Sequence, residues 1–475
     1  MRQLWKQMKV ERDGIVFLLL TLFFLLLLIV LPEGMPPQAK GTMAITIYGI
    51  LLWTFEPIAF GITSVIVMLL LLFLKAASID IVLAGFSSPA IFLIIAGMMM
   101  AQGISQTRLM ERITYFLLTK WGNSSKGIFI SSILFMQLQA FFIPATSVRS
   151  SLVLPIILQI INSVKAHRDS TFTKLMLVGT AFGGNISGTA ILTAAVGNIL
   201  TVEMLSIYLG TSLSYFDWFI YALPIWILVT MVVPWTLWKV YKPETYDFSS
   251  LQKEIQEKRK ELGKLTTSEK KAIAILTLVV GLWVTEPFHG YHPTVAALLA
   301  CVLMALPKIG FTNWKHIVKV NFDMVLLVGA TLSLGLALIE SQAIDYMAAT
   351  LLSAEWIALA LASPWLTLIF VTLATQVYHL GVTNVSTVVV TLLPILISLS
   401  VQAGYDPVVI CYLASITTLY GFILVVETMP NVVVYSTGLV EQRDFLLPGL
   451  WATLASMIIT ILVAFTWWRW LGFWP

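Results

Sequence analysis

Charged residues are scarce in this 475-residue sequence: Asp, Glu, Lys and Arg make up 11% of it, against about 25% in typical soluble domains. Hydrophobic residues make up 59%, and apolar runs such as 15–31 and 447–467 approach or reach the length that a membrane-spanning helix needs, which is about 20 residues. The composition excludes a soluble globular protein. It predicts an all-α polytopic membrane protein with about 11 transmembrane helices.

Other absences exclude further classes. The two cysteines, Cys301 and Cys411, lie inside apolar segments, so we expect neither a disulfide framework nor a thiolate metal site. The sequence has no phosphate-binding loop, Gly-x-Ser-x-Gly, His-Glu-x-x-His or dinucleotide-binding pattern. We therefore expect no enzyme activity, no metal and no resident cofactor. No basic face indicates a nucleic-acid partner, and membrane lipid is the expected surrounding.

The charges that are present gather in one stretch near the middle of the chain. Fifteen of the 52 charged residues lie between Lys239 and Lys271, and nine of these are Lys or Arg. Positive loops stay in the cytoplasm, so we expect a cytoplasmic linker, with a helix over 251–265 on the membrane surface or in water. A basic N-terminal head predicts that the first helix also starts in the cytoplasm, in a multi-pass protein of the cytoplasmic membrane.

The two parts of the chain that flank this linker resemble each other. Trp-x-x-Glu-Pro occurs at 53 and again at 283, Leu-Pro-Ile at 154 and 393, and a Gly/Pro-Asn pair at 197 and 430. Three motifs in the same order at nearly constant spacing indicate a duplicated unit. The predicted division is 1–42 for the head and first transmembrane helix, 43–240 for the first repeat, 241–272 for the linker and 273–475 for the second repeat.

The two repeats are expected to be inverted relative to each other. The first helix leaves the cytoplasm, so the first repeat begins outside, yet it ends at the cytoplasmic linker and must contain an odd number of crossings. The second repeat then starts inside, and the C-terminus lies outside. Inverted repeats are typical of secondary transporters, whose sites lie at broken helices near the membrane midplane.

One pair of breaks in the apolar pattern carries Ser, Thr and Asn at equivalent places. Pro144 precedes Thr146 and Ser147, either of which could cap a restarting helix, and the second repeat has polar residues before its own Leu-Pro-Ile. We interpret both as re-entrant hairpins whose half-helix N-termini form an anion cradle. Ordinary Ser/Thr packing between helices is the alternative. The substrate-binding candidates are Thr146 and Ser147 at the first tip, and Thr383, Asn384, Ser386 and Thr387 at the second.

Arg149, three residues after Thr146, is the strongest single clue. An arginine deep in a membrane protein costs at least a few kcal/mol unless it faces a cavity or a partner. A guanidinium offers bidentate donors to a carboxylate or another oxyanion, so Arg149 is predicted to contact an anionic substrate or to replace a cation. The alternative is an internal ion pair with Glu203 or Glu427 that locks the domain.

The second pair of breaks contains Gly, Pro and Asn inside apolar sequence, over 183–198 and 420–431. Such segments suggest unwound helices whose carbonyl groups and side chains coordinate ions or substrate; close helix packing through small residues is the alternative for the first. Glu427 could carry a coupling proton or could be neutral and hydrogen-bonded. Thr428 and Pro430 are assigned to substrate binding, and the ion-binding or coupling candidates are Gly188, Asn198, Glu427 and Asn431.

With these motifs, the chain resembles the divalent anion/sodium symporter family of the wider ion-transporter superfamily, from Trp53 to about Leu439. That family has Ser-Asn-Thr at each hairpin tip and Gly-Thr-Pro-Pro-Asn in each unwound helix. In this sequence the second tip has the same residue types as the family motif. The stretch from Glu427 to Asn431 (Glu-Thr-Met-Pro-Asn) keeps part of the motif of the second unwound helix. The first tip falls on Ala145, Thr146 and Ser147, and Ala194-Ala-Val-Gly-Asn198 stands for the first element.

The resemblance implies a homodimer with a scaffold domain and a mobile transport domain that works as an elevator, with sodium ions and a substrate carboxylate at the tips. We expect a secondary active transporter of di- or tricarboxylates such as citrate, or of a related divalent oxyanion, acting by cation-coupled symport or by anion exchange. Because Arg149 stands beside a tip that holds sodium in the family, sodium and protons are both open as coupling ions. The alternative is a sodium/proton antiporter or another inorganic-ion transporter of the superfamily.

Overall fold

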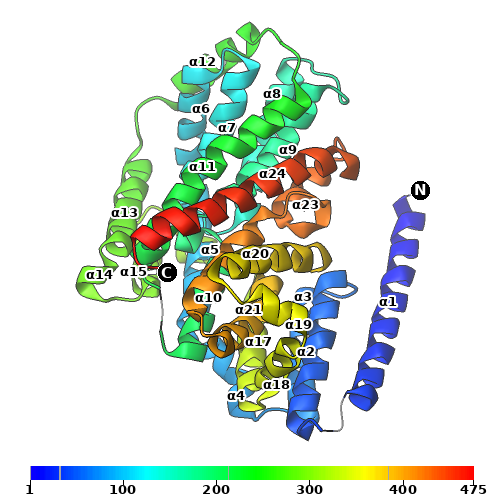
Figure 1. Ribbon diagram of the computed structural model, residues 1–475. Coiled ribbons are helices and arrows are strands. Elements are labelled where there is room, and N and C mark those ends of the chain that lie inside the picture. The colour runs from blue at the N-terminus through cyan, green and yellow to red at the C-terminus, as the bar shows by residue number, and fades with distance from the viewer. Residues whose placement is uncertain (1, 32–33, 212, 383, 475) are drawn as a thin grey trace. The chain divides into compact units, whose positions relative to one another are not determined.

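The computed structural model describes residues 2–31, 34–211, 213–382 and 384–474, and over these ranges every regular element is helical. Figure 1 labels the main helices. The elements up to the linker are α1 (Arg2–Val30), α2 (Pro37–Phe55), α3 (Phe60–Phe73), α4 (Ile79–Ala84), η1 (Gly85–Ser87), α5 (Pro89–Ser105), α6 (Leu109–Trp121), α7 (Ser125–Gln139), α8 (Thr146–Ser163), α9 (Thr171–Ile186), η2 (Leu192–Ala194), α10 (Val196–Leu209), α11 (Tyr215–Tyr241) and α12 (Ser249–Leu262).

The second half of the chain continues this pattern of long helices and short breaks. Its elements are α13 (Thr267–Val284), α14 (Glu286–His289), α15 (Pro293–Ala305), α16 (Trp314–Ile317), α17 (Phe322–Glu340), α18 (Ala343–Leu352), α19 (Glu355–Ala360), α20 (Pro364–Gly381), α21 (Val385–Ala403), α22 (Pro407–Thr417), η3 (Thr418–Tyr420), η4 (Val425–Glu427), α23 (Met429–Tyr435), α24 (Gln442–Val463) and η5 (Ala464–Trp468), a π-helical turn.

The chain forms two compact units, each assembled from separated segments. Unit 1 comprises Met1–Ile91, Leu200–Ser212 and Asn321–Thr418, and unit 2 comprises Phe92–Ile199, Leu213–Val320 and Leu419–Pro475. In unit 1, α17 packs against α3 and α4, and α21 packs against α22. In unit 2, α9 packs against α7, α8, α11 and α23. The first predicted hairpin tip therefore belongs to unit 2 and the second to unit 1.

Local sequence signals explain where many helices begin. Ser214 and Thr266 start α11 and α13 with complete capping boxes, in which side chain and backbone satisfy each other's hydrogen bonds. Proline occupies the first turn of α2, α15, α20 and α22, where its missing N–H is not needed. Gly404 ends α21 in the left-handed conformation, with φ of 78°, which glycine adopts without steric cost.

The positions of the helices repeat along the chain. α5 and α17 begin at residues 89 and 322, and α10 and α23 begin at residues 196 and 429, a separation of 233 in both cases. The 3₁₀ turns η2 and η4 also begin 233 residues apart, at 192 and 425. α8 and α21, which follow the two hairpin tips, begin 239 apart. The motifs noted in the sequence thus lie on helices that recur at the same spacing. The repeat boundaries and the inverted orientation remain predictions.

Several helices are long and apolar enough to cross a membrane. Among the described residues there are five by length and composition, or six if α4 with η1 and α5, bent by 43° at Ser88, count as one span. These five are Glu11–Val30, Tyr215–Tyr241, Phe322–Glu340, Val385–Ala403 and Gln442–Trp468. Other apolar helices, such as α3 and α10, have 14 residues each, fewer than the roughly 20 that one span requires. The prediction of about 11 spans remains a prediction.

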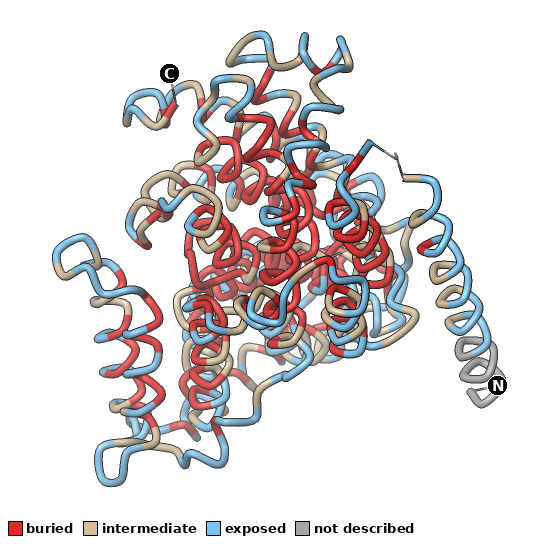
Figure 2. The backbone as a smooth tube through the Cα atoms, turned by 90° about the horizontal axis from the view of Figure 1, so that it is seen from below, coloured by how far each residue is buried: buried red, intermediate tan, exposed pale blue. Residues whose placement is uncertain are grey.

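The helices α1 and α12 expose and bury the residues that their sequences lead one to expect. α1 exposes most of its apolar residues, as the pale tube at the N-terminus in Figure 2 shows, while Phe24 is buried and stacks on Tyr48 of α2. The linker forms α12, as its spacing predicts, and buries Leu251, Ile255 and Leu262 against its own unit. Polar bonds also tie α12 down, because Gln159 of α8 donates to Glu254 at 2.6 Å.

Candidate functional site

The first hairpin tip is the start of α8. The chain leaves α7 at Gln139 and enters α8 at Thr146 after an irregular stretch that includes Pro144. The N-cap is Ala145, with φ of −114° and ψ of 124° and no side-chain cap. The expectation that Thr146 or Ser147 caps this helix is therefore wrong: the extended residue falls one position earlier, which puts both hydroxyls inside the first turn. The first-turn N–H groups of α8 consequently have no side-chain cap.

Arg149 lies fully buried in this first turn, with 0% of its surface exposed. Its Nε donates to Oγ of Ser187 at 2.9 Å, and its Nη1 donates to the carbonyl oxygen of Ile143. Its Nη2 has no hydrogen-bond partner among the described residues. The guanidinium is thus held in a fixed direction by two bonds, with one nitrogen still able to donate.

The internal ion pair that was the alternative for Arg149 is not formed within unit 2. No described carboxylate of that unit lies within 4.0 Å of the guanidinium, and Glu427 uses its carboxylate elsewhere. Glu203 belongs to unit 1, where its side chain is hydrogen-bonded to Ser88. In unit 2 the buried cation therefore has no compensating negative charge.

The first broken helix lies where the sequence predicts it. α9 ends at Ile186, and irregular backbone with the short turn η2 separates it from α10. Asn198, near the start of α10, holds this break together, because its Nδ2 donates to the carbonyl oxygens of Gly188 at 2.7 Å and Ile191 at 3.2 Å. Its Oδ1 is buried and has no partner among the described residues. The side chain thus fixes the break and keeps one acceptor free.

The second broken helix repeats this construction at a spacing of 233. Asn431 in the first turn of α23 donates to the carbonyl oxygens of Gly421 at 2.8 Å and Leu424 at 3.0 Å, ten and seven residues before it, as in the first break. Here Oδ1 is occupied, because Nδ2 of Asn185 donates to it at 3.2 Å. Asn185 also donates to the carbonyl of Gly421 at 3.3 Å, so it connects α9 to the second break.

Glu427 ends the turn η4 and is 2% exposed. Its Oε2 accepts the backbone N–H of Ile423 at 2.9 Å, so its carboxylate closes the turn to which it belongs. Thr428 follows as the N-cap of α23 but makes no side-chain cap, and its buried Oγ1 has no partner among the described residues. Glu427 therefore stabilises the backbone of the second helix break, whereas Thr428 next to it has a buried hydroxyl that is free to bind a ligand.

Two glycines bring the first tip and both breaks together. A side chain at Gly184 would begin 2.2 Å from Oγ of Ser150 and 3.2 Å from Pro430. One at Gly188 would begin 3.2 Å from the methyl group of Thr146. Accordingly α8, α9 and α23 pack directly against one another. The glycines are required here by close approach, which explains why the small residues of the first break cannot be exchanged freely.

Around this contact, four buried polar atoms have no partner in the described part of the chain: Nη2 of Arg149, Oγ of Ser150, Oδ1 of Asn198 and Oγ1 of Thr428. Buried polar atoms are satisfied in the great majority of cases, and each exception requires an explanation. The set contains one fixed cation, hydroxyl groups that donate or accept and one amide acceptor. Such a set can bind an oxyanion that carries a further hydroxyl or protonated group.

The second tip, in unit 1, keeps the predicted cap. Asn384 is the N-cap of α21, and its Oδ1 accepts the backbone N–H of Ser386 at 2.9 Å. Thr387 is fully buried, and its Oγ1 has no partner among the described residues. Thr383 lies outside the described residues. α20 packs beside α21, where Tyr378 and Thr391 share a hydrogen bond of 2.9 Å.

Sequence reasoning missed four residues that the structure makes prominent. Ser187 and Asn185 hold Arg149 and the second break in place, and Ser150 presents a free hydroxyl beside Gly184. His379 of α20 is buried, and neither of its ring nitrogens has a hydrogen-bond partner in the described chain. Ser150 and Ser187 lie inside the quoted motifs, but their partners are distant in sequence and no local pattern indicates them.

Comparison with known proteins gives a family match over almost the whole chain. Residues 13–474 match the family described as "Sodium:sulfate symporter transmembrane region". Among individual relatives, the chain is 24% identical to a sodium-dependent dicarboxylate transporter of Staphylococcus saprophyticus, over 94% of this chain and 89% of that protein. It is 26% identical to a citrate/succinate antiporter of Escherichia coli, over 92% of this chain and 94% of that protein.

A solved structure shares the fold. The YdaH transporter of Alcanivorax borkumensis aligns over 98% of this chain and 100% of its own, with a TM-score of 0.50 and 12% sequence identity. At this identity the likeness concerns the fold alone. It agrees with an all-helical membrane protein that contains broken helices.

Proposed function

Because the chain belongs to the sodium:sulfate symporter family, a family of multi-pass membrane transporters and not of enzymes, we propose that it is a secondary active transporter of small di- or tricarboxylates. The names of the Staphylococcus and Escherichia relatives support this substrate class. The proposed substrate site lies in unit 2, where the first hairpin tip packs against the two broken helices. We propose that the chain forms inverted repeats that work by an elevator motion in a homodimer.

The observation that carries this proposal is the buried guanidinium of Arg149, which has no carboxylate partner within unit 2 and one nitrogen, Nη2, without a hydrogen-bond partner among the described residues. Leaving a charge buried without a partner is strongly unfavourable, and a bound carboxylate would supply both the missing charge and an acceptor for Nη2. The free hydroxyls of Ser150 and Thr428 can bind its second oxygen or a neighbouring group. An inorganic cation would be repelled by the same guanidinium, so the antiporter alternative gains no support.

The same residue bears on the coupling ion. In the family resemblance, the first tip holds sodium, whereas here a fixed positive charge stands three residues after Thr146 in the first turn of α8. The Asn198 amide also donates to the carbonyl oxygens of Gly188 and Ile191, and Gly188 and Asn198 were both candidates for ion binding. We therefore propose anion exchange, with Arg149 in place of a coupling cation at this tip.

Counterflow in proteoliposomes tests the substrate class. Vesicles loaded with citrate or succinate should take up the labelled acid, and Arg149→Gln should reduce uptake by at least 100-fold because the transported anion loses its buried counter-charge. Arg108→Gln is the matched control, since Arg108 is an exposed arginine at the N-cap of α6 that pairs with Glu111. Unchanged uptake by Arg149→Gln, in protein that reconstitutes normally, would contradict the assignment.

Ion replacement tests the exchange mode separately. With citrate or succinate inside and labelled acid outside, uptake should be the same in sodium and in choline buffers. It should vanish when the internal anion is omitted. Uptake that follows an imposed sodium gradient into vesicles without internal anion would refute exchange and leave the substrate class intact.

A further inference from the structure

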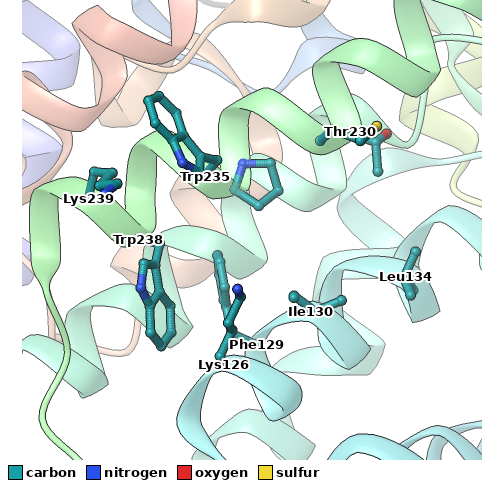
Figure 3. A pocket seen from close by; sticks show the side chains of 10 residues that line it. Lys126, Phe129, Ile130, Leu134, Thr230, Trp235, Trp238 and Lys239 are labelled. Atoms are coloured by element: carbon teal, nitrogen blue, oxygen red, sulfur yellow. The ribbon is translucent and has the colours of Figure 1, made fainter.

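Unit 2 contains a groove that the proposed transport site does not use. It lies between α7 and α11, has a volume of about 490 Å³, and falls in the range of about 300–1,000 Å³ typical of small-molecule sites. We call it the α7–α11 groove, and its lining residues are Lys126, Phe129, Ile130, Leu134, Thr230, Met231, Pro234, Trp235, Trp238 and Lys239. Figure 3 shows Phe129 of α7 and Trp238 of α11 between the two helices.

The groove is closed at one end by a direct contact between its two walls. Nε1 of Trp226 donates to Oε1 of Gln137 at 2.7 Å, about one helical turn beyond Leu134 and Thr230. From Lys126 to Leu134 the wall rises by about 12 Å at 1.5 Å per residue. One leaflet of a bilayer has a hydrocarbon layer of about 15 Å, half of the roughly 30 Å core. The groove therefore has nearly the depth of one leaflet.

Charge is present at the other end only. Lys126 and Lys239 lie toward the same end in Figure 3, away from Leu134 and Thr230, and both are exposed. The lining contains no Asp or Glu. Lys239 lies near the end of α11 that leads into the linker, and its Nζ is 5.8 Å from the ring centre of Trp235. Lysine and tryptophan at the end of an apolar span are typical of the interface between hydrocarbon and headgroups.

We propose that the α7–α11 groove binds one anionic phospholipid of the surrounding membrane. An acyl chain lies against Phe129, Pro234 and Trp238, and the headgroup phosphate lies between Lys126 and Lys239. Basic pockets at the ends of membrane helices bind acidic headgroups in this way. An apolar trough of nearly leaflet depth, whose charged lining residues are the two lysines at its mouth, complements such a lipid in shape and in charge. The site is independent of the anion that the protein transports.

The test compares lipids that share their acyl chains. Purified protein is incubated with palmitoyl-oleoyl phosphatidylglycerol or phosphatidylcholine, and retained lipid is counted by native mass spectrometry and followed by thermal shift. Phosphatidylglycerol should bind and raise the melting temperature more than phosphatidylcholine, and inorganic phosphate should have no effect. K126Q/K239Q should weaken phosphatidylglycerol binding about 30-fold, the effect expected for two surface lysines.

Two further variants make the outcome specific. K264Q/K270Q removes two exposed lysines of the linker region outside the groove and should leave phosphatidylglycerol binding unchanged. Ile130→Trp fills the groove but keeps both lysines, and should weaken binding by both lipids. Equal binding of the two lipids by wild type, or wild-type retention by K126Q/K239Q, would overturn the proposal. So would a change of oligomeric state in Ile130→Trp, because a second copy of the chain would then be the occupant.

Discussion

Replacing Arg149 by methionine separates a ligand-binding arginine from a structural one. The change removes a buried charge that costs about 2.5–3.5 kcal/mol on membrane-insertion scales. It also leaves the carbonyl of Ile143 without its donor, at about 1–3 kcal/mol. Ser187 keeps its own bond to the carbonyl of Gly184 at 2.6 Å. Because these two terms oppose each other, the ligand-free stability should change only between a loss of about 0.5 kcal/mol and a gain of about 2.5 kcal/mol.

The response to ligand should change far more. A ligand at 100 times its dissociation constant stabilises the native state by about 2.7 kcal/mol, and in Arg149→Met this stabilisation by citrate should disappear. The measurement is thermal unfolding of purified protein in detergent, with and without saturating citrate, followed by the exposure of buried thiols. Cys301 and Cys411 are both buried and free, so a thiol-reactive dye reports unfolding.

Arg112 provides the matched control. Its Nε pairs with Glu269 at 2.7 Å, and its other nitrogens donate to the carbonyls of Leu262, Gly263 and Lys264. Arg112→Met removes one partner of a largely buried ion pair and should cost about 3–5 kcal/mol, with the citrate response retained. The reasoning fails if Arg149→Met behaves as Arg112→Met does, that is, if it is strongly destabilised and still responds to citrate.

Three further substitutions test how the site and its surroundings are built. Asn431→Ala removes the donors that hold the second break and should lower the unfolding free energy by about 1–3 kcal/mol in a denaturant titration. Gly184→Ala places a Cβ 2.2 Å from Oγ of Ser150, which should cost about 1–3 kcal/mol, and adding Ser150→Ala should restore most of it. Burial raises the pKa of Glu244, but bonds from the start of α9 outweigh it and the pKa is lowered. Glu244→Gln should therefore destabilise at pH 7, and its difference from wild type should fade as the pH falls through the lowered folded pKa and the wild-type carboxylate is protonated.

Each of these three substitutions has an outcome that would contradict the prediction. Wild-type stability of Asn431→Ala would show that the break holds without its amide. A double variant as unstable as Gly184→Ala would show that the strain arises elsewhere than at Ser150. A difference between Glu244→Gln and wild type that stays constant as the pH falls from 7 to well below the ordinary pKa of a glutamate would show that the carboxylate charge plays no part, since its contribution must fade as the pH drops through its folded pKa.

The general plan of the molecule follows from its sequence because that plan depends on local chemistry. Scarce charge indicates a membrane protein, and the spacing of 251–265 predicts α12. Gly and Pro inside apolar runs predict both helix breaks, which the structure places at 187–195 and 421–428. The repeated Gly/Pro-Asn pair places Asn198 and Asn431 at a spacing of 233, and in the structure each of the two side chains donates to carbonyls ten and seven residues before it.

What the sequence does not predict depends on contacts between distant segments. The cap of α8 falls on Ala145 because chain direction after Pro144, and not side-chain propensity, decides where the first turn begins. Ser150 becomes part of the site only because Gly184 and Pro430 bring α9 and α23 against it. The α7–α11 groove is equally hidden, since Lys126 and Lys239 are 113 positions apart in the sequence.

In unit 2, the polar groups of the two helix breaks differ from Arg149 in how far the chain itself satisfies them, and this difference bears on transport. Asn198 and Asn431 satisfy the exposed carbonyls of the breaks from within the chain, so irregular backbone persists in apolar surroundings without a ligand. Arg149 is satisfied only in part, and in unit 2 no carboxylate neutralises it. The helix breaks thus keep their conformation without a ligand, whereas the positive charge of Arg149 is neutralised within unit 2 only when an anion binds. Such a site resists moving empty across the membrane, which is the requirement of an exchanger.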